Sequence, residues 1–307
     1  MGRPAIQRET AATEASSTVV VPAAVPPALR AAVDALFEDA ARHGPRMPAL
    51  ARRIAPAAAS FAAVLWLAGW MPWRTVLETT MSARAADVAL VGPIFAAVVV
   101  FGWALAPLVR VPTIPLVLGG GGCMGLGLLL VHDGLLVVAS LPSVFGALLL
   151  GVSAARVLQR AVWIVPILAA AAISDIRSVQ GGVTDRLLDD VAGGASTQYL
   201  DPVFRIAPAA LAPVDSFVLH LPAATGTWML GLVDIVAVGM LLGLCHLQWR
   251  PEGRTAFALA GALVVTLLVS TAVPVLPVLG VAWILTNARL VWRATRFTMR
   301  RLTYLGG

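Results

Sequence analysis

Two aspartates stand out in this 307-residue chain because each lies inside a long apolar stretch. Asp175 lies in the run 161–179, and Asp234 lies in the run 228–247. About 20 apolar residues, wound into a helix that rises about 1.5 Å per residue, cross the roughly 30 Å hydrocarbon core of a bilayer. A carboxylate at such a depth is costly and by default marks a functional site with a partner. Each aspartate is therefore the other's candidate partner.

The two acids are predicted to lie at similar depths. Asp175 comes near the end of its run and Asp234 near the start of the next one, so two helices that cross in opposite directions bring both into the same half of the bilayer. Two carboxyls in contact cannot both carry a charge cheaply, so such a pair shares a proton. It then offers a base that activates water and an acid that protonates a scissile carbonyl or a leaving amine.

Other interpretations exist for each acid taken alone. Asp234 could be a buried acid bonded to a neighbouring helix, or part of a proton or ion relay in a transporter or channel. Asp175 could be a helix-end residue that pairs with Arg177. An inactive membrane scaffold that retains the pair is a further alternative. A protease needs both side chains on one water-accessible cavity, whereas a continuous polar path across the bilayer would favour transport.

The composition predicts a polytopic helical membrane protein. The chain is 59% hydrophobic and 12% charged, with a mean hydropathy of +0.87, whereas about a quarter of the residues of a soluble domain are charged. We expect an all-α transmembrane bundle of about eight spans in one membrane domain, residues 47–307, after a flexible N-terminal tail, residues 1–46. The apolar runs are 54–71, 88–108, 111–131, 135–152, 161–179, 228–247, 256–273 and 276–291.

The basic residues indicate the orientation of the bundle. All 22 are arginines, and they gather at alternate ends of the runs, as Arg52, Arg156 and Arg254 do. Because cytoplasmic loops of membrane proteins carry an excess of positive charge, both termini are predicted to lie in the cytoplasm. The net charge of +6 thus comes from arginines that orient the chain in a lipid bilayer, and no nucleic-acid partner is expected.

No metal or organic cofactor is expected. Cys123 and Cys245 both fall in apolar runs, and the 4 histidines show no ligand spacing with them. The glycines 119–122 are not followed by the Lys-Ser/Thr of a phosphate-binding loop. We interpret them as a surface for close helix packing.

Two further segments bear on the site. Residues 274–277 (PVLP) separate the last two runs, and non-helical backbone at membrane depth must be buried in protein or line a cavity. Residues 216–221 (SFVLHL), shortly before Asp234, have the β-branched and aromatic content of a short strand, or form a membrane-surface loop. A strand edge at Val218 would be able to hold an extended substrate by β-augmentation.

The aspartates and the proline turn together resemble the presenilin and signal peptide peptidase family, most closely its short bacterial and archaeal members. In that family a Tyr-Asp helix, a Gly-x-Gly-Asp helix and a Pro-Ala-Leu turn build the active site. The matching segments are 174–179 (SDIRSV), 230–236 (LGLVDIV) with Gly239, and 274–276 (PVL), within a similar region of about residues 160–292. Asp175 and Asp234 match the two aspartates in order and spacing.

The resemblance implies an intramembrane aspartyl protease that hydrolyses peptide bonds within transmembrane segments. Its catalytic residues would be Asp175 and Asp234, its partners transmembrane peptides or proteins, and its location a prokaryotic cytoplasmic membrane. The predicted orientation is that of signal peptide peptidases and opposite to that of presenilin. The residues expected to contact substrate are Gly231, Val233, Pro274, Val275, Leu276 and Val218.

The chain departs from the family pattern at three positions. Ser174 replaces the tyrosine, Val233 replaces the second glycine, and Val275 replaces the alanine. A branched side chain at Val233, next to the acid, is expected to narrow the cleft or to force its helix aside.

Prepilin peptidases are a second aspartyl-protease alternative. They too have two membrane-associated aspartates, and residues 175–177 (DIR) followed by Arg186 and Leu187 resemble their first site. They place these acids at the cytoplasmic face, however, and a lysine usually follows their second motif. This chain contains no lysine.

Overall fold

The computed structural model describes residues 47–69, 71–132, 135–158, 163–179, 199–201, 205–206, 218–223, 226–248, 252–269, 274–289, 291–293 and 296. The chain divides after residue 42 into two units, and all described residues belong to the second. The predicted N-terminal tail, residues 1–46, and most of the connection between the two aspartates lie outside the described residues.

Each apolar run predicted from the sequence coincides with a helix, in whole or in part. A short polar helix, α3 (Met71–Thr80), lies between the first two of them. The apolar helices are α2 (Met47–Gly69), α4 (Ala83–Leu105) with the 3-10 helix η1 (Ala106–Arg110), α5 (Thr113–His132), α6 (Leu136–Leu158), α7 (Ile164–Val179), α9 (Leu232–Leu247), α10 (Glu252–Val269) and α11 (Val275–Thr286).

The lengths of these helices fit a membrane protein. Among the described residues, 5 segments are long and apolar enough to span a membrane, and α9 and α11 are apolar but shorter. The spanning segments are Leu50–Ala68, Ala83–Arg110, Thr113–Val131, Val138–Leu158 and Glu252–Val269. A helical membrane bundle is thus confirmed, while the number of eight spans stays a prediction.

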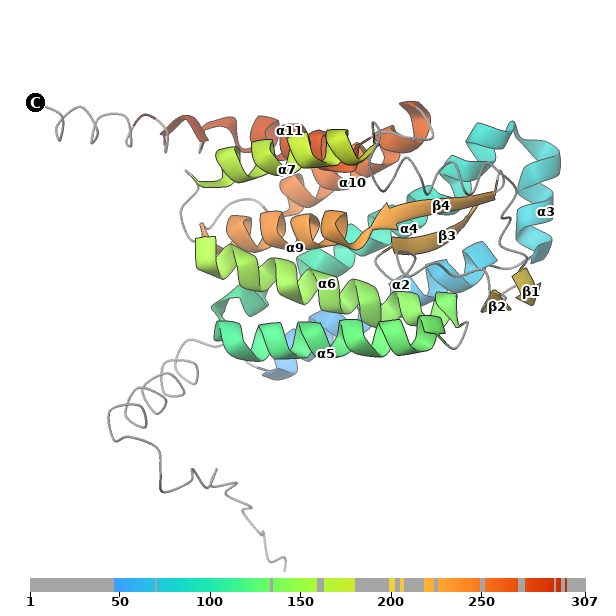
Figure 1. Ribbon diagram of the computed structural model, residues 1–307, viewed down its shortest axis with the longest axis horizontal. Coiled ribbons are helices and arrows are strands. Elements are labelled where there is room, and N and C mark those ends of the chain that lie inside the picture. The colour runs from blue at the N-terminus through green and yellow to red at the C-terminus, as the bar shows by residue number, and fades with distance from the viewer. Residues whose placement is uncertain are drawn as a thin grey trace, which may run out of the picture. The chain divides into compact units, whose positions relative to one another are not determined.

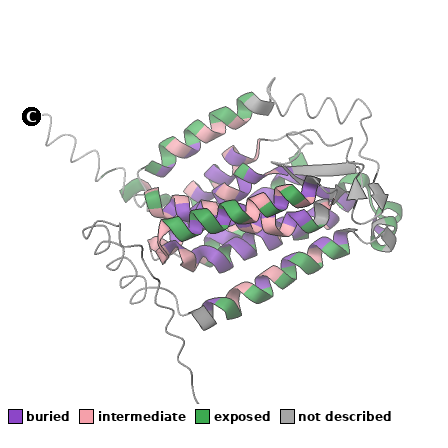
Figure 2. Cartoon of the chain, turned by 60° about the horizontal axis from the view of Figure 1, so that its bottom comes forward, coloured by how far each residue is buried: buried purple, intermediate pink, exposed green. Residues whose placement is uncertain are grey.

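Helix α9 lies at the centre of the bundle, where it contacts α4, α6, α10 and α11 (Figure 1). Figure 2 shows that buried residues concentrate in the central helices, while α5 and α7 expose much of their surface. Because lipid tails are as apolar as the side chains, close packing has to hold such helices together. Two glycines provide it: a Cβ on Gly151 of α6 would overlap the carbonyl oxygen of Val236, and one on Gly239 would lie 2.6 Å from that of Leu148.

The glycine-rich helix α5 packs on α6 in the same way. A Cβ on Gly120 would lie 3.0 Å from the carbonyl oxygen of Gly146, and one on Gly127 would overlap the Ser143 side chain. The interpretation of the glycines as a packing surface is thus confirmed for Gly120, and Gly127 further along the helix packs in the same way. Gly121 and Gly122, by contrast, have open space beside them.

Strands interrupt the expected all-helical pattern before α9. Strand β1 (Tyr199–Asp201) pairs antiparallel with β2 (Arg205–Ile206), and β3 (Val218–Ala223) pairs antiparallel with β4 (Gly226–Gly231). A strand at residues 218–221 agrees with the sequence-based prediction, and β3 contacts α4 and α6.

The prediction of one continuous helix over residues 228–247 was wrong. Trp228 to Gly231 belong to β4, and the helix begins only at Leu232. The hairpin satisfies its backbone hydrogen bonds by internal pairing, and it buries Leu221 and Leu230 on one face, so an extended segment is stable next to the bundle.

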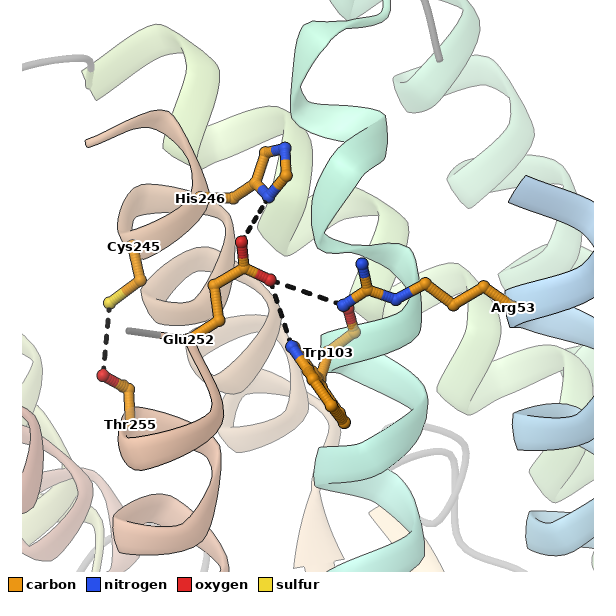
Figure 3. A network of polar contacts seen from close by, with 6 residues as sticks. All are labelled: Arg53, Trp103, Cys245, His246, Glu252 and Thr255. Atoms are coloured by element: carbon orange, nitrogen blue, oxygen red, sulfur yellow. Dashed lines mark hydrogen bonds and ion pairs between the residues drawn. The ribbon is translucent and has the colours of Figure 1, made fainter. Parts of the chain in front are cut away.

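A polar network joins α2, α4, α9 and α10 at the end of the bundle opposite Asp234 (Figure 3). Glu252 accepts a hydrogen bond from Trp103 Nε1 at 3.0 Å and forms an ion pair with Arg53 at 3.4 Å. Its other carboxylate oxygen lies 2.6 Å from Nδ1 of His246. The Arg53 guanidinium also lies 5.0 Å from the centroid of the Trp103 ring.

This end of the bundle also carries Arg156 and Arg254, and it is called the arginine-rich end below. The Arg156 guanidinium donates to the carbonyl oxygens of Arg110 and Val111, at 2.7 and 2.8 Å, where the chain leaves η1. Cations suit the C-terminal end of a helix, whose last carbonyls lack an intrahelical donor. Arg156 therefore satisfies carbonyl oxygens at the end of η1, and it lies at the same end of the bundle as the other arginines named here.

The glycine contact between α6 and α9 generates a stability prediction. Replacing Gly151 by alanine should lower the free energy of unfolding by about 1–3 kcal/mol, since the added methyl group would overlap the α9 backbone and overpacking costs about that much. Thermal unfolding of the purified protein in detergent measures the change. Gly261→Ala in α10 is the matched control, because nothing lies within 4 Å of a Cβ there. Equal melting temperatures for the two variants would contradict the close contact.

Candidate active site

Asp234 lies in the first turn of α9. Gly231 is the N-cap, with φ −63° and ψ 137°, so Asp234 occupies the third helical position. The backbone N–H of Gly231 donates to its carboxylate, as the acidic residue of a capping box accepts from its N-cap. The side chain is buried, with 9% exposed. The prediction that placed this acid deeper within a helix was wrong because α9 begins later than the apolar run does.

The lack of a side chain on Gly231 leaves room for the carboxylate of Asp234. A Cβ built on it would lie 3.0 Å from Oδ2 of Asp234 and 3.7 Å from Cγ. Any other residue would therefore require the carboxylate to shift by a few tenths of an ångström. Gly231 also pairs with Val218 across the β3–β4 hairpin, so one residue ends the strand, caps the helix and holds the acid.

Asp175 lies on the inward face of α7. Ile164 and Leu168 on this helix are buried, and Asp175 follows them at helical spacing and is half-buried. Residues on the other side of α7, such as Ile173 and Ser174, are exposed. The inward face packs on α11, where Leu168 lies beside Gly280.

The start of α11 supplies the partner of Asp175. Pro274 is the N-cap, with φ −59° and ψ 119°, and Val275 and Leu276 are helical, which corrects the expectation of a non-helical segment 274–277. The first N–H groups of a helix have no intrahelical acceptor. Here the N–H of Leu276 donates to Oδ2 of Asp175 at 3.1 Å, and the backbone of Val275 adds a second interaction.

Helix α11 brings the two acids into one site. It packs on α7, which carries Asp175, and on α9, which carries Asp234. The carboxylates are close enough for the charge of Asp175 to act on Asp234. Each is held by a backbone N–H at the start of a helix, Asp234 by α9 and Asp175 by α11. The arrangement presents two oriented carboxyls, which is what acid–base activation of a water molecule requires.

The other residues predicted for the site lie around this pair. Gly231 and Leu276 contact the carboxylates directly, and Pro274 and Val275 form the helix start that supplies the donors. Val233 is 66% exposed and lies on the outer side of α9. Val218 is placed by its backbone pairing alone, opposite Gly231.

Sequence reasoning did not identify the hydrogen bonds that hold the two acids. A glycine three positions before Asp234 and a proline just before Val275 are helix-start signals, and they would have placed both carboxylates at N-terminal turns. Among the described residues, no group of three or more His, Cys, Asp or Glu side chains could hold a metal ion.

The sequence and the structure were compared with known proteins. No protein-family model, curated protein or solved structure matches this chain.

The bond between Asp175 and the start of α11 yields a second prediction. Asp175→Ala should lower stability by about 1–3 kcal/mol, because the N–H of buried Leu276 loses its acceptor. Asp175→Asn keeps a carbonyl oxygen and should lose less. Thermal unfolding, together with faster hydrogen exchange at the Leu276 amide in the alanine variant, checks this. Ser174→Ala, one residue away on the exposed face, serves as the control. If the alanine and asparagine variants behave alike, the hydrogen bond does not contribute.

Proposed function

We propose that this protein is an intramembrane aspartyl protease of the presenilin and signal peptide peptidase type. The observation that carries the proposal is that Asp175 and Asp234, from different helices of a membrane bundle, are close enough to interact electrostatically, with each carboxylate oriented by a backbone N–H. Its substrates are transmembrane peptides or proteins, and its location is a prokaryotic cytoplasmic membrane with both termini in the cytoplasm.

The proposed reaction needs only the two carboxyls and a water molecule. With one proton shared between them, the charged carboxylate takes a proton from water while the protonated one donates to the scissile carbonyl oxygen. The water oxygen attacks the carbonyl carbon and forms a gem-diol. The protonated carboxyl then donates to the amide nitrogen while the other carboxylate takes a proton from a gem-diol hydroxyl. The C–N bond breaks, the C=O bond of the new carboxyl terminus forms, and the pair again holds one proton.

Preorganisation of the acids supports this proposal. Leu276 donates to Oδ2 of Asp175, the backbone of Val275 adds a second interaction, and Gly231 orients Asp234 through the N-cap bond. Catalytic groups held by neighbouring backbone lose little entropy when substrate arrives. Gly231 and Pro274, which match the family's glycine and proline, are thus the N-caps of the two helices whose starts hold the acids.

The valine that replaces the family's second glycine is compatible with the proposal. The expectation was that Val233 would narrow the cleft beside the acid. Its side chain is 66% exposed, whereas Asp234 is buried. The branched side chain is therefore not enclosed together with the buried carboxylate.

The alternatives receive less support. Residues 235–244 of α9, between Asp234 and the arginine-rich end, are all apolar, so no polar path for a transported ion or proton follows this helix. Prepilin peptidases place their acids at the cytoplasmic face, which the positive-inside rule assigns to the arginine-rich end. Asp175 and Asp234 lie at the opposite end of α9 and α11.

The hairpin next to the acids is the proposed support for the substrate. A transmembrane helix protects its peptide bonds by backbone hydrogen bonding, so hydrolysis requires a locally extended segment. The β3–β4 sheet has 2 strands, and β4 leads directly into the helix of Asp234. A substrate strand that adds to this sheet would lie beside the dyad, with the start of α11 opposite.

The dyad predicts a defined cleavage activity. Purified protein should cleave a model transmembrane peptide, and Asp175→Asn or Asp234→Asn should reduce turnover by at least about a hundredfold, since acid–base catalysis contributes that much. The rate should follow a bell-shaped pH profile whose two apparent ionisations belong to the pair. Product analysis by mass spectrometry measures this, with the exposed Glu78→Gln as control. Wild-type turnover in both asparagine variants would eliminate the dyad.

The substrate-support hypothesis makes its own prediction. Val218→Pro removes a backbone N–H at the first position of β3, where a strand tolerates proline. Cleavage of the transmembrane peptide should fall several-fold, while a small inhibitor directed at the dyad should bind with nearly unchanged affinity. Val218→Thr, which keeps the donor and the β-branch, should cleave normally. Wild-type cleavage by the proline variant would mean that the substrate is held elsewhere.

A further inference from the structure

A pocket between α10 and α11 has no part in the proposed protease chemistry. Its volume is about 530 Å³, and it is lined by Gly253, Arg254, Phe257, Leu285 and Thr286. These residues lie at the start of α10 and at the end of α11, so the pocket opens at the arginine-rich end, away from the aspartates.

The two large apolar side chains of the pocket are open to the surroundings. Phe257 is 83% exposed and Leu285 is 72% exposed. Phe257 lies one helical turn deeper in the bilayer span of α10 than Arg254 does. The pocket therefore changes from cationic at its outer margin to apolar toward the membrane interior.

More arginines continue the cationic margin. Arg289 and Arg293 follow Thr286 by three and seven positions, and both are exposed and helical. Helix α11 ends at Thr286, with Asn287 as its C-cap, and the hydrogen bond from the Val291 N–H to the Asn287 carbonyl oxygen, at 3.1 Å, belongs to the helical residues that follow. The two arginines therefore come directly after the end of α11. Trp292, 69% exposed, is of the residue type that anchors helices at the headgroup level.

Glu252, two positions before Arg254, does not neutralise this cationic margin. Glu252 is the only carboxylate at the arginine-rich end among the described residues. Its oxygens are engaged by Arg53, Trp103 and His246, which come from α2, α4 and α9 rather than from α11 (Figure 3). The charge of Arg254 thus stays available to a ligand in the pocket.

We propose that this pocket binds an anionic phospholipid. The phosphate lies between Arg254 and Arg289, and an acyl chain lies against Phe257 and Leu285. Guanidinium groups form charge-assisted bonds to phosphate, and basic pockets between transmembrane helices are suited to anionic headgroups. The backbone at Gly253 is also open, because nothing lies within 4 Å of a Cβ there, so the headgroup can approach the first turn of α10.

Lipid binding to the purified, delipidated protein tests the proposal. Native mass spectrometry with dioleoyl phosphatidylglycerol and dioleoyl phosphatidylcholine should show about tenfold tighter binding of the anionic lipid. Arg254→Gln and Arg289→Gln should each weaken that binding about fivefold, which corresponds to about 1 kcal/mol per arginine near a headgroup. Arg84→Gln, an exposed arginine at the start of α4 on the opposite end, should leave it unchanged. Melting temperatures without lipid establish that the variants are folded.

A second set of measurements separates a lipid from a free phosphate. Phe257→Ser should weaken binding of the phosphatidylglycerol several-fold, and millimolar glycerol phosphate should not displace the lipid. Equal affinity for the two lipids, unchanged binding in both arginine variants, or full displacement by glycerol phosphate would each overturn the proposal. Because the readout is binding, it is independent of whether the dyad cleaves peptides.

Discussion

The constraint on which the site depends is the need of helix-starting N–H groups for an acceptor. Inside a membrane there is no water to satisfy them. At the start of α11 the acceptor is the carboxylate of Asp175, and at the start of α9 it is that of Asp234. The same bonds satisfy the backbone and orient the acids. An intramembrane carboxylate is costly, and here the cost is offset by donors that the helices would otherwise leave unsatisfied.

The position of those helix starts depends in turn on close packing at the centre of the bundle. Gly151 and Gly239 let α6 and α9 approach until the backbones touch. The contact holds α9 in place, and the β3–β4 hairpin runs directly into it at Gly231. A shift of α9 by the width of a methyl group would move Asp234 relative to α11. Packing far from the acids thus sets the geometry of the acids.

The two ends of the bundle have different chemistry. At one end the charges are carboxylates held by backbone N–H groups next to a hairpin. At the other, arginines bind helix C-termini, pair with Glu252 and border the pocket between α10 and α11. The apolar stretch of α9 separates the two. Proteolysis at one end and lipid anchoring at the other would be complementary, because a protease of membrane segments must keep a fixed depth in the bilayer.

The sequence by itself determined the class and the candidate acids. Apolar runs and scarce charge are enough to predict a membrane bundle, because the cost of burying charge in lipid is local and large. For the same reason Asp175 and Asp234 were identified from their positions alone. Hydropathy does not distinguish a strand from a helix, so residues 228–231 were assigned to the wrong element. Only the tertiary structure decided that Leu276 donates to Asp175, that Gly231 makes room for Asp234 and that Val233 is exposed. These facts depend on where α9 and α11 begin and on how they pack, which are contacts between distant segments that no local pattern encodes.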